Sequence, residues 1–331
     1  MAQHLIHIGW AKAGSSFLQE WFTRHPELQY VTHGIAGFRD VLEVARVVDS
    51  PFKYYVTSAE QLGVPYGDAG RFRVELALGG ATPLDPVQRR QAAVCDVLKT
   101  LFPGSRVLIV TRGHRALLLS GYSQEVRGGA VLGAKARYNA MRKATPGPLP
   151  REYRHRDYDF VIGLYREAFG HDNVIVLPYE LLRDDPAKFV VVLEERLGLE
   201  HREIEVGRVN PSLTAEELHW YPEISRRVSF VASLFGERAF RRIYRRYVAH
   251  VTTRNRLAPL IRVLARMAPS RRVTADDFPA SAWLSSHGCA ESLRGDPLFA
   301  PYAREYLWDE EYVRSEWARH RARMEASSVR A

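Results

Sequence analysis

The stretch HLIHIGWAKAGSSFLQEWF, residues 4–22, decides the fold of this chain. Its apolar start is typical of a buried strand. Gly9 and Gly14 then bracket a tight turn, and apolar residues recur at helical spacing from Ser15 onward. A helix that begins directly after such a turn presents unpaired backbone N–H groups and the positive end of its dipole, which suits a phosphate. An ordinary strand–turn–helix fits the same pattern, so the residues within the turn matter.

The position of the lysine separates this turn from the loops that hydrolyse nucleoside triphosphates. Those loops place lysine directly after the second glycine, whereas here that position is Ser15 and the lysine is Lys12. The next strong apolar strand, RVLIVTR (106–112), ends in Thr111-Arg112, where a magnesium-binding aspartate would be expected. The turn is therefore predicted to hold a phosphate without the usual metal. This argues against an ATPase, a GTPase or a kinase.

The composition indicates a globular protein. At 331 residues, with 46% hydrophobic and 26% charged residues, the chain can bury one large or two modest cores. No apolar stretch reaches transmembrane length, and a strand begins too early to leave room for a signal peptide, so we expect a cytoplasmic protein. Cys95 and Cys289 are expected to be buried free thiols, and the scattered histidines do not suggest a metal site.

The net charge of +9 points to an anionic partner. Nucleic acid, an anionic membrane and an anionic small molecule all fit such a charge. No recognisable nucleic-acid module accompanies it. A nucleotide with several phosphates would account for part of the excess, so we expect a small-molecule partner and no nucleic acid.

Strands and helices alternate over the first two thirds of the chain. Strand patterns lie at 52–62, 106–112 and 173–182, and helical patterns at 88–102, 116–129, 157–170 and 184–200. This alternation predicts an α/β fold with a parallel sheet flanked by helices. The segment 139–157 carries three prolines and is expected to be a surface loop. On the helix at 88–102, one side is expected to hold Ala92, Cys95, Val97, Leu98 and Leu101.

The remainder of the chain is expected to be mainly helical and is rich in arginine. We expect a core domain over residues 1–205 and a helical region over 206–331 that packs on it and contributes to an acceptor pocket. In RAFRRIYRRYVAHV (238–251), apolar residues recur at helical spacing with arginines opposite. The apolar stripe there is expected to be a packing face.

Arg112 and Ser120 form a second candidate constellation. Arg112 lies at the C-terminal tip of its predicted strand, where ligands of open parallel sheets bind. Ser120 follows eight residues later, about two turns into the next helix. A guanidinium fork and a hydroxyl suit a second phosphate group. Taken alone, the two residues also fit a surface arginine and a helix-packing serine.

Together these motifs resemble those of the sulfotransferases that use PAPS, 3′-phosphoadenosine 5′-phosphosulfate. The family's proline-lysine-x-glycine-threonine-threonine loop is similar to AKAGSSF (11–17). Its arginine, followed eight residues later by serine and then by a tyrosine, is similar to Arg112, Ser120 and Tyr122.

A third family motif, a Tyr-Glu-x-Leu strand end before an Asp-Pro helix entry, is similar to YELL (179–182) and Asp185-Pro186. The resemblance spans residues 4–200, with the motifs in the family's order. It implies a bacterial-type sulfotransferase fold, a three-layer relative of the P-loop NTPase fold.

The resemblance also implies a role for each matching residue. Arg112 and Ser120 resemble the clamp on the donor's 3′-phosphate. Tyr179 is similar to a residue that packs near the adenine, with a core tyrosine as the alternative. The loop is similar to the site of the 5′-phosphosulfate, which implies donor contacts from Lys12, Ala13, Gly14, Ser15, Ser16 and Phe17.

Three features depart from the family pattern. Ala11 replaces the usual proline, and Gly113-His114 replaces the Asn/Asp-Pro that follows the arginine. The R-x-G-x-x-G segment of the small-phenol enzymes is absent, so no third contact to the 3′-phosphate is assigned. The geometry of the turn after Arg112 is therefore open.

The implied reaction moves a sulfuryl group from PAPS to a hydroxyl, or less readily to an amine, by in-line attack. It leaves PAP, which is PAPS without the sulfuryl group, and requires no metal. Lys12 would stabilise the phosphate leaving group. The acceptor is expected to be a small molecule, a carbohydrate or a lipid-linked molecule. The sequence determines neither its identity nor the oligomeric state.

The general base has two main candidates. Glu60 follows a strand that should run parallel to the first, and Ser58-Ala59-Glu60 resembles a Ser-x-Glu of bacterial relatives. A carboxylate that stabilises a helix N-terminus is the alternative reading of Glu60. His33, in the loop after the first helix, is the second candidate. His114 is weaker because it lies on the 3′-phosphate side.

Two other functions stay open. One is a nucleotide-dependent kinase or NTPase of related fold, which the position of Lys12 disfavours. The other is a non-catalytic basic protein whose segment 238–272 binds anionic lipid or nucleic acid. We expect no integral membrane segment, and peripheral association with a membrane is open.

Overall fold

The computed structural model describes residues 3–10, 12–31, 51–59, 62–63, 86–143, 155–206, 212–278 and 290–328. The chain divides into two compact units, which we call the sheet unit and the helical unit. The sheet unit comprises Met1–Gly113, Glu152–Asn210 and Ser286–Tyr306, and the helical unit comprises His114–Arg151, Pro211–Ser285 and Leu307–Ala331. The units alternate along the chain, whereas the predicted domains meet at one boundary near residue 205.

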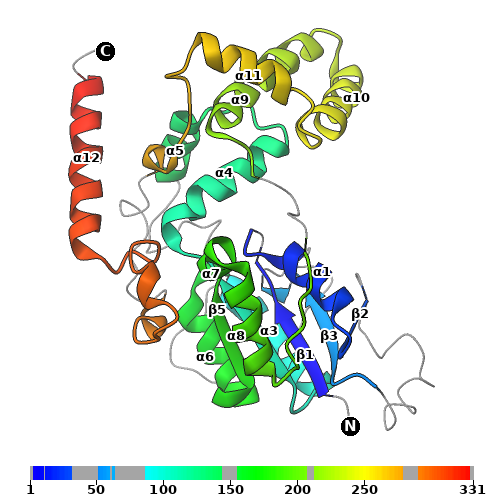
Figure 1. The fold of residues 1–331 in the computed structure, drawn as a ribbon. Coiled ribbons are helices and arrows are strands. Elements are labelled where there is room, and N and C mark those ends of the chain that lie inside the picture. Colours follow the sequence, from blue (N-terminus) through cyan, green and yellow to red (C-terminus); the bar gives the residue numbers. More distant parts are fainter. Residues whose placement is uncertain are drawn as a thin grey trace. The chain divides into compact units, whose positions relative to one another are not determined.

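The sheet unit is built on a sheet that has five strands in the described residues. Their order across the sheet is β2 (Leu28–Tyr30), β3 (Tyr54–Ala59), β1 (Gln3–Ile8), β4 (Arg106–Thr111) and β5 (Val174–Pro178) (Figure 1). Every neighbouring pair is parallel. β4 and β5 are apolar runs that are buried almost throughout, as expected of strands covered on both faces. The predicted α/β fold with a parallel sheet flanked by helices is confirmed.

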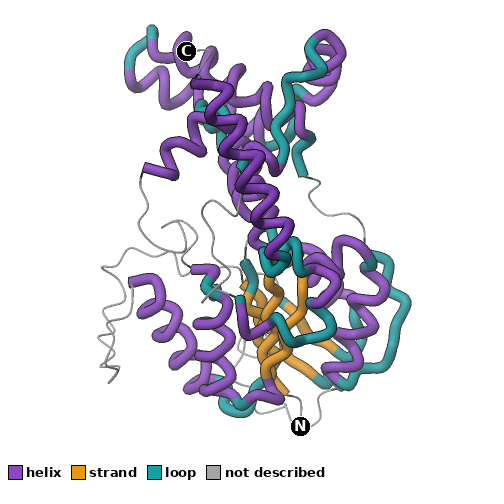
Figure 2. Tube along the Cα trace, turned by 90° about the vertical axis from the view of Figure 1, so that its left-hand side faces the viewer, coloured by secondary structure: helices purple, strands orange, loops and turns teal. Residues whose placement is uncertain are grey.

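Helices cover both faces of this sheet (Figure 2). α1 (Ser15–Arg24) packs on β2 and β3. α3 (Pro86–Leu101) packs against α6 (Tyr158–Phe169), which lies on β4 and β5. The crossovers from β1 to β2 and from β3 to β4 run in opposite directions across the sheet. Since such crossovers are right-handed, α1 and α3 lie on opposite faces.

The order of the strands creates a switch point between β1 and β4. From β1 the chain moves to one side of the sheet, toward β2, and from β4 it moves to the other side, toward β5. The two strands are neighbours, with Ile8 paired to Ile109. The loops that leave their carboxyl ends therefore flank the crevice where open α/β sheets bind ligands.

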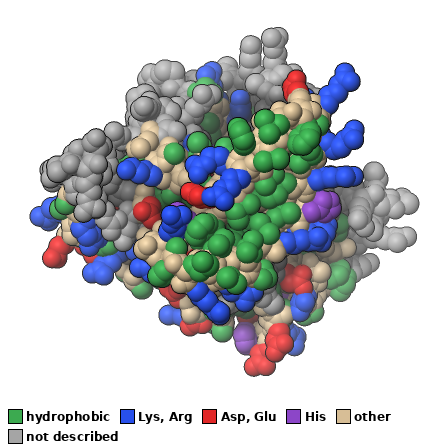
Figure 3. Space-filling view, turned by 90° about the horizontal axis from the view of Figure 1, so that it is seen from above, with side chains coloured by type: hydrophobic (Ala, Val, Ile, Leu, Met, Phe, Trp, Pro, Cys, Tyr) green, Lys and Arg blue, Asp and Glu red, His purple; other side chains and the backbone are tan. Residues whose placement is uncertain are grey.

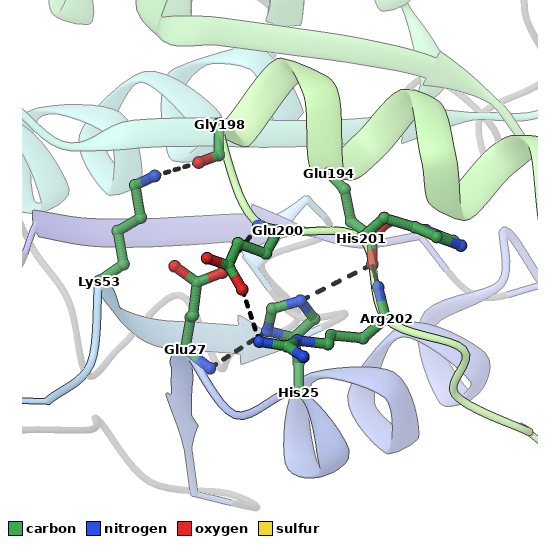
Figure 4. A network of polar contacts seen from close by, with 8 residues as sticks. All are labelled: His25, Glu27, Lys53, Glu194, Gly198, Glu200, His201 and Arg202. Carbon is green, nitrogen blue, oxygen red and sulfur yellow. Dashed lines mark hydrogen bonds and ion pairs between the residues drawn. The ribbon is translucent and has the colours of Figure 1, made fainter.

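A network of polar contacts at the amino end of β3 connects the end of α8 (Pro186–Leu197) to the end of α1 (Figure 4). The Glu194 side chain is buried, and its Oε1 lies 3.7 Å from Nε2 of His25, which follows α1. Lys53 donates from its amine to the carbonyl of Gly198, where a φ of +66° lets the helix end in a left-handed turn. The network lies away from the carboxyl ends of the strands.

Two segments differ from the expected secondary structure. The strand predicted over 173–182 ends earlier, because Tyr179–Asp184 forms the helix α7. The helix α5 (Ala134–Lys143) occupies the beginning of the loop predicted over 139–157. In both places residues that favour helices continue the chain after a break in the pattern.

The buried side of α3 differs in part from the prediction. Val97 is 51% and Leu101 is 48% exposed, so these two do not share one side of the helix with the buried Ala92, Cys95 and Leu98. Cys95 is a buried free thiol as expected, and burial raises its pKa to about 12. Cys289 lies outside the described residues. The buried stripe runs through Gln91, Ala92, Cys95 and Leu98.

The helical unit confirms that the C-terminal part is mainly helical. Its elements are α4 (Leu117–Arg127), α5, α9 (Ala215–Ser233), α10 (Glu237–Tyr247), the π-helical turn η6 (Val248–Thr252), α11 (Ala258–Met267) and α12 (Glu310–Ser328). Short 3-10 turns of the two units lie at His114–Ala116, His171–Asn173, Ala275–Asp277, Glu291–Leu293 and Ala300–Tyr302. None of the described helices combines the length and apolar character needed to cross a membrane.

Candidate functional site

The loop after β1 is closed by hydrogen bonds to one carbonyl. The backbone N–H of Ala13 donates to the carbonyl of Trp10 at 3.1 Å, and the hydroxyl of Ser15 donates to the same oxygen at 3.3 Å. Lys12 adopts a φ of +67° and Gly14 one of +84°. Lys12 is thus held in the left-handed region, which is uncommon for a residue with a side chain.

This loop leads directly into the N-terminus of α1. The first helical hydrogen bond runs from the N–H of Leu18 to the carbonyl of Gly14, so the N–H groups of Ser15, Ser16 and Phe17 precede the helical ladder. Gly14 supplies no side-chain cap. The helix start therefore offers backbone donors and a positive dipole end to an anion. The Ser15 hydroxyl, by contrast, is engaged within the loop.

We expect Gly14→Ala to lower the stability of the protein. An added Cβ would lie 2.5 Å from Cδ2 of Leu182, and a left-handed residue with a side chain costs about 1–2 kcal/mol. Gly104→Ala is the matched control, because Gly104 has a φ of +76° with open space around it. Thermal unfolding should show a larger loss of melting temperature for Gly14→Ala than for Gly104→Ala.

Arg112, at the tip of β4, reaches across the switch point to this loop. Its Nη1 donates to the carbonyl of Lys12 at 2.6 Å. The guanidinium also lies over the ring of Tyr179, 4.8 Å from the ring centroid. Tyr179 is partly buried at the start of α7. Three segments that are distant in sequence thus meet at one edge of the sheet.

A buried tyrosine and a buried carboxylate hold the turn that carries Arg112. The Tyr158 hydroxyl accepts from the N–H of Arg112 at 3.1 Å and donates to its carbonyl at 2.8 Å. Glu180 accepts from the N–H of Gly113 at 2.9 Å, and burial raises the pKa of this carboxyl. A Cβ on Gly113 would lie 2.7 Å from the carbonyl carbon of Glu305. Glycine at this departure from the family pattern therefore allows a close backbone approach.

Arg156 adds a second buried guanidinium near this turn. Burial lowers the pKa of Arg112, and the positive charge of Arg156 lowers it further. Arg156 is 5% exposed and comes just before α6. Two arginines close together in a buried setting raise the local affinity for an anion.

Arg156 and the residues that hold the turn were not predicted as site residues. Glu180 stands within the quoted Tyr-Glu-Leu-Leu motif, and an acidic residue directly after an apolar strand could have identified it. Tyr158 and Arg156 come from the start of a helix, where no local pattern signals a role in a site.

Other predicted site residues lie in the helical unit or outside the described residues. Ser120 is buried on α4 of the helical unit, while Arg112 belongs to the sheet unit, so their shared clamp on a phosphate stays a prediction. Glu60 and His33 lie outside the described residues. His114 is buried at the first position of the helical unit. Among the described residues, no group of three or more His, Cys, Asp or Glu side chains is arranged to hold a metal ion.

A likeness to known proteins is found among solved structures. No protein-family model and no curated protein matches the chain. Among solved structures, the chain is similar to a sulfotransferase from Alicyclobacillus acidocaldarius, with 16% sequence identity and a TM-score of 0.39, over 73% of this chain and 99% of the other. Because similarity at this level does not reveal chemistry, the function has to be inferred from the residues of the site.

Proposed function

We propose that this protein is a PAPS-dependent sulfotransferase. It would move a sulfuryl group to a hydroxyl, or less readily an amine, of a small-molecule, carbohydrate or lipid-linked acceptor. One observation carries the proposal: Nη1 of Arg112 lies 2.6 Å from the carbonyl of Lys12, 100 residues away in sequence. This contact joins the loop that resembles a phosphosulfate site to the arginine that resembles a 3′-phosphate clamp.

The hydrogen-bond donors at this edge of the sheet fit a nucleotide that carries phosphates at both the 5′ and the 3′ position of its ribose. The α1 N-terminus and Lys12 suit the 5′ side, and the guanidinium of Arg112 suits a further phosphate. When bound, PAPS would supply an activated sulfuryl group. The amine of Lys12 would then donate to the oxygen on which negative charge develops, and the N–H groups of Ser16 and Phe17 would assist.

A kinase or NTPase is the less favoured function. In such enzymes an acidic residue near the end of a neighbouring strand commonly binds magnesium. Here β4 ends in Thr111, whose hydroxyl lies 2.7 Å from that of Tyr306. β4 therefore ends in a hydroxyl rather than in a carboxylate.

The proposal predicts that the protein binds PAP much better than ADP, because only PAP has a 3′-phosphate for Arg112. Arg112→Ala should weaken PAP binding by about 1.5–3 kcal/mol, as for a hydrogen bond to a charged group. Arg89→Ala, on the exposed face of α3, is the matched control and should bind PAP normally. Calorimetry with both nucleotides measures this.

Equal affinity for PAP and ADP would contradict the proposal, and tight magnesium-dependent binding of ATP would support the kinase alternative. Once PAP preference is established, a panel of alcohols, carbohydrates and lipid-linked compounds can be incubated with PAPS. A mass gain of one SO₃ unit would identify the acceptor.

A further inference from the structure

The positive charge of this chain is concentrated in one segment. Residues 238–272 hold eleven arginines and no acidic residue, whereas the rest of the chain holds 36 Lys or Arg against 38 Asp or Glu. The whole positive excess of the protein therefore lies on α10, α11 and the turns that flank them. All of this segment belongs to the helical unit.

The arginines of α10 point outward, because the aromatic side of this helix packs inward. The Tyr247 hydroxyl lies 3.0 Å from that of Ser225 on α9. Arg242 and Arg246, one turn apart, are exposed. Among the described residues, the only carboxylate within ion-pair distance of an α10 arginine is that of Glu237. Most of the positive charge of the α10 arginines is therefore available to another molecule.

Next to these arginines, apolar side chains are exposed on two helices. On α11, Leu260, Val263 and Met267 share one face at 50%, 52% and 80% exposure, while Ile261 on the other side is buried. Four residues in the last turn of α9 and directly after it are between 53% and 69% exposed: Phe230, Val231, Leu234 and Phe235. Figure 3 shows hydrophobic side chains gathered on one face, with lysine and arginine side chains around them. An apolar patch of this kind marks an interaction site.

We propose that these residues form a docking face for an anionic lipid bilayer. We call it the basic apolar face: the exposed apolar residues of α9 and α11 with the arginines of α10 and α11. Aromatic and aliphatic side chains that enter the headgroup boundary, with arginines at their rim, are the features of helices that lie in a membrane interface. Anionic headgroups attract the arginines over the range of a Debye length.

Two other occupants fit the face less well. The phosphates of a nucleic acid would pair with the arginines, but the exposed phenylalanine, leucine and methionine side chains would have no apolar partner. A second copy of the chain would bring eleven arginines against eleven arginines, which like-charge repulsion disfavours. The inference does not depend on the sulfotransferase proposal, although a bilayer would present a lipid-linked acceptor to such an enzyme.

Sedimentation with vesicles tests the inference on the full chain. The protein should bind vesicles of phosphatidylcholine that contain about one third phosphatidylserine. Its affinity for vesicles of pure phosphatidylcholine should be lower by about 10-fold or more. Arg242→Glu with Arg246→Glu should lower binding to the anionic vesicles by about 10-fold or more. Phe235→Ser with Met267→Ser should abolish the binding that remains at high salt, where charge attraction is screened.

Matched controls come from α3, which exposes the same residue types in the sheet unit. Arg89→Glu with Arg90→Glu, and Val97→Ser with Leu101→Ser, should bind like the unmodified protein. Since all of these side chains are exposed, thermal unfolding should confirm that each variant is folded, and the arginine pair and the apolar pair provide independent tests.

Three results would overturn the inference. The first is equal binding to neutral and anionic vesicles. The second is binding of a duplex DNA oligonucleotide that the Phe235→Ser, Met267→Ser variant retains in full, which would assign the face to nucleic acid. The third is a dimer in light scattering that this variant converts to a monomer, without vesicle binding by either protein, which would assign the face to a second copy.

Discussion

Lys12→Ala is expected to lower kcat by about 10²-fold or more, while the melting temperature of the unliganded protein stays nearly unchanged. The amine would act on negative charge that grows on the leaving phosphate as sulfur is transferred, so its removal raises the barrier more than it weakens ground-state binding. The backbone of the loop should persist in the variant. The carbonyl of residue 12, which accepts from Arg112, is unaffected, and alanine meets the same left-handed strain as lysine.

Single-turnover rates, together with PAP affinity from calorimetry, separate the two possible roles of this lysine. Lys188→Ala, on the exposed face of α8, is the matched control and should turn over normally. If Lys12→Ala loses only donor affinity and keeps its kcat, the lysine is a binding residue and the mechanism is wrong. A large fall in melting temperature would instead indicate a role in folding.

The local pattern of the first strand, turn and helix was sufficient to predict that part of the fold. The helix predicted from Ser15 begins at Ser15, because the apolar periodicity changes there and Gly14 permits the turn. The entry of α8 was equally clear, since Asp185 caps it through the N–H of Lys188 at 3.0 Å and proline follows at the first helical position. Such signals involve residues that are neighbours in sequence.

The support of the site could not be predicted in this way. Thr111 meets Tyr306 across 195 residues of sequence, and Gly113 meets Glu180 across 67. These contacts depend on which segments the completed fold brings together, and no spacing along the chain encodes them. The early end of β5 has a similar cause, because VLPYELL continues the apolar run while its second half forms a helix.

Replacing Glu60 by glutamine is expected to lower turnover by about 10²–10⁴-fold while PAP binding stays normal, if Glu60 is the general base. Glu60 itself lies outside the described residues, and its placement is inferred from the strand before it. β3 ends at Ala59, which pairs with Ile8, the last residue of β1. Parallel strands end at the same edge, so the chain leaves β3 beside the loop that carries Lys12.

The structural alternative for Glu60 predicts a different outcome in the same experiment. A carboxylate that only stabilises a helix N-terminus contributes about 1 kcal/mol or less, so its amide would keep nearly the full rate. Glu20→Gln, on the exposed side of α1, is the matched control for the loss of one carboxylate. If Glu60→Gln stays active and His33→Ala is inactive with normal PAP affinity, the proton passes to the histidine. If both variants stay active, the base comes from another residue, and the role proposed for Glu60 is wrong.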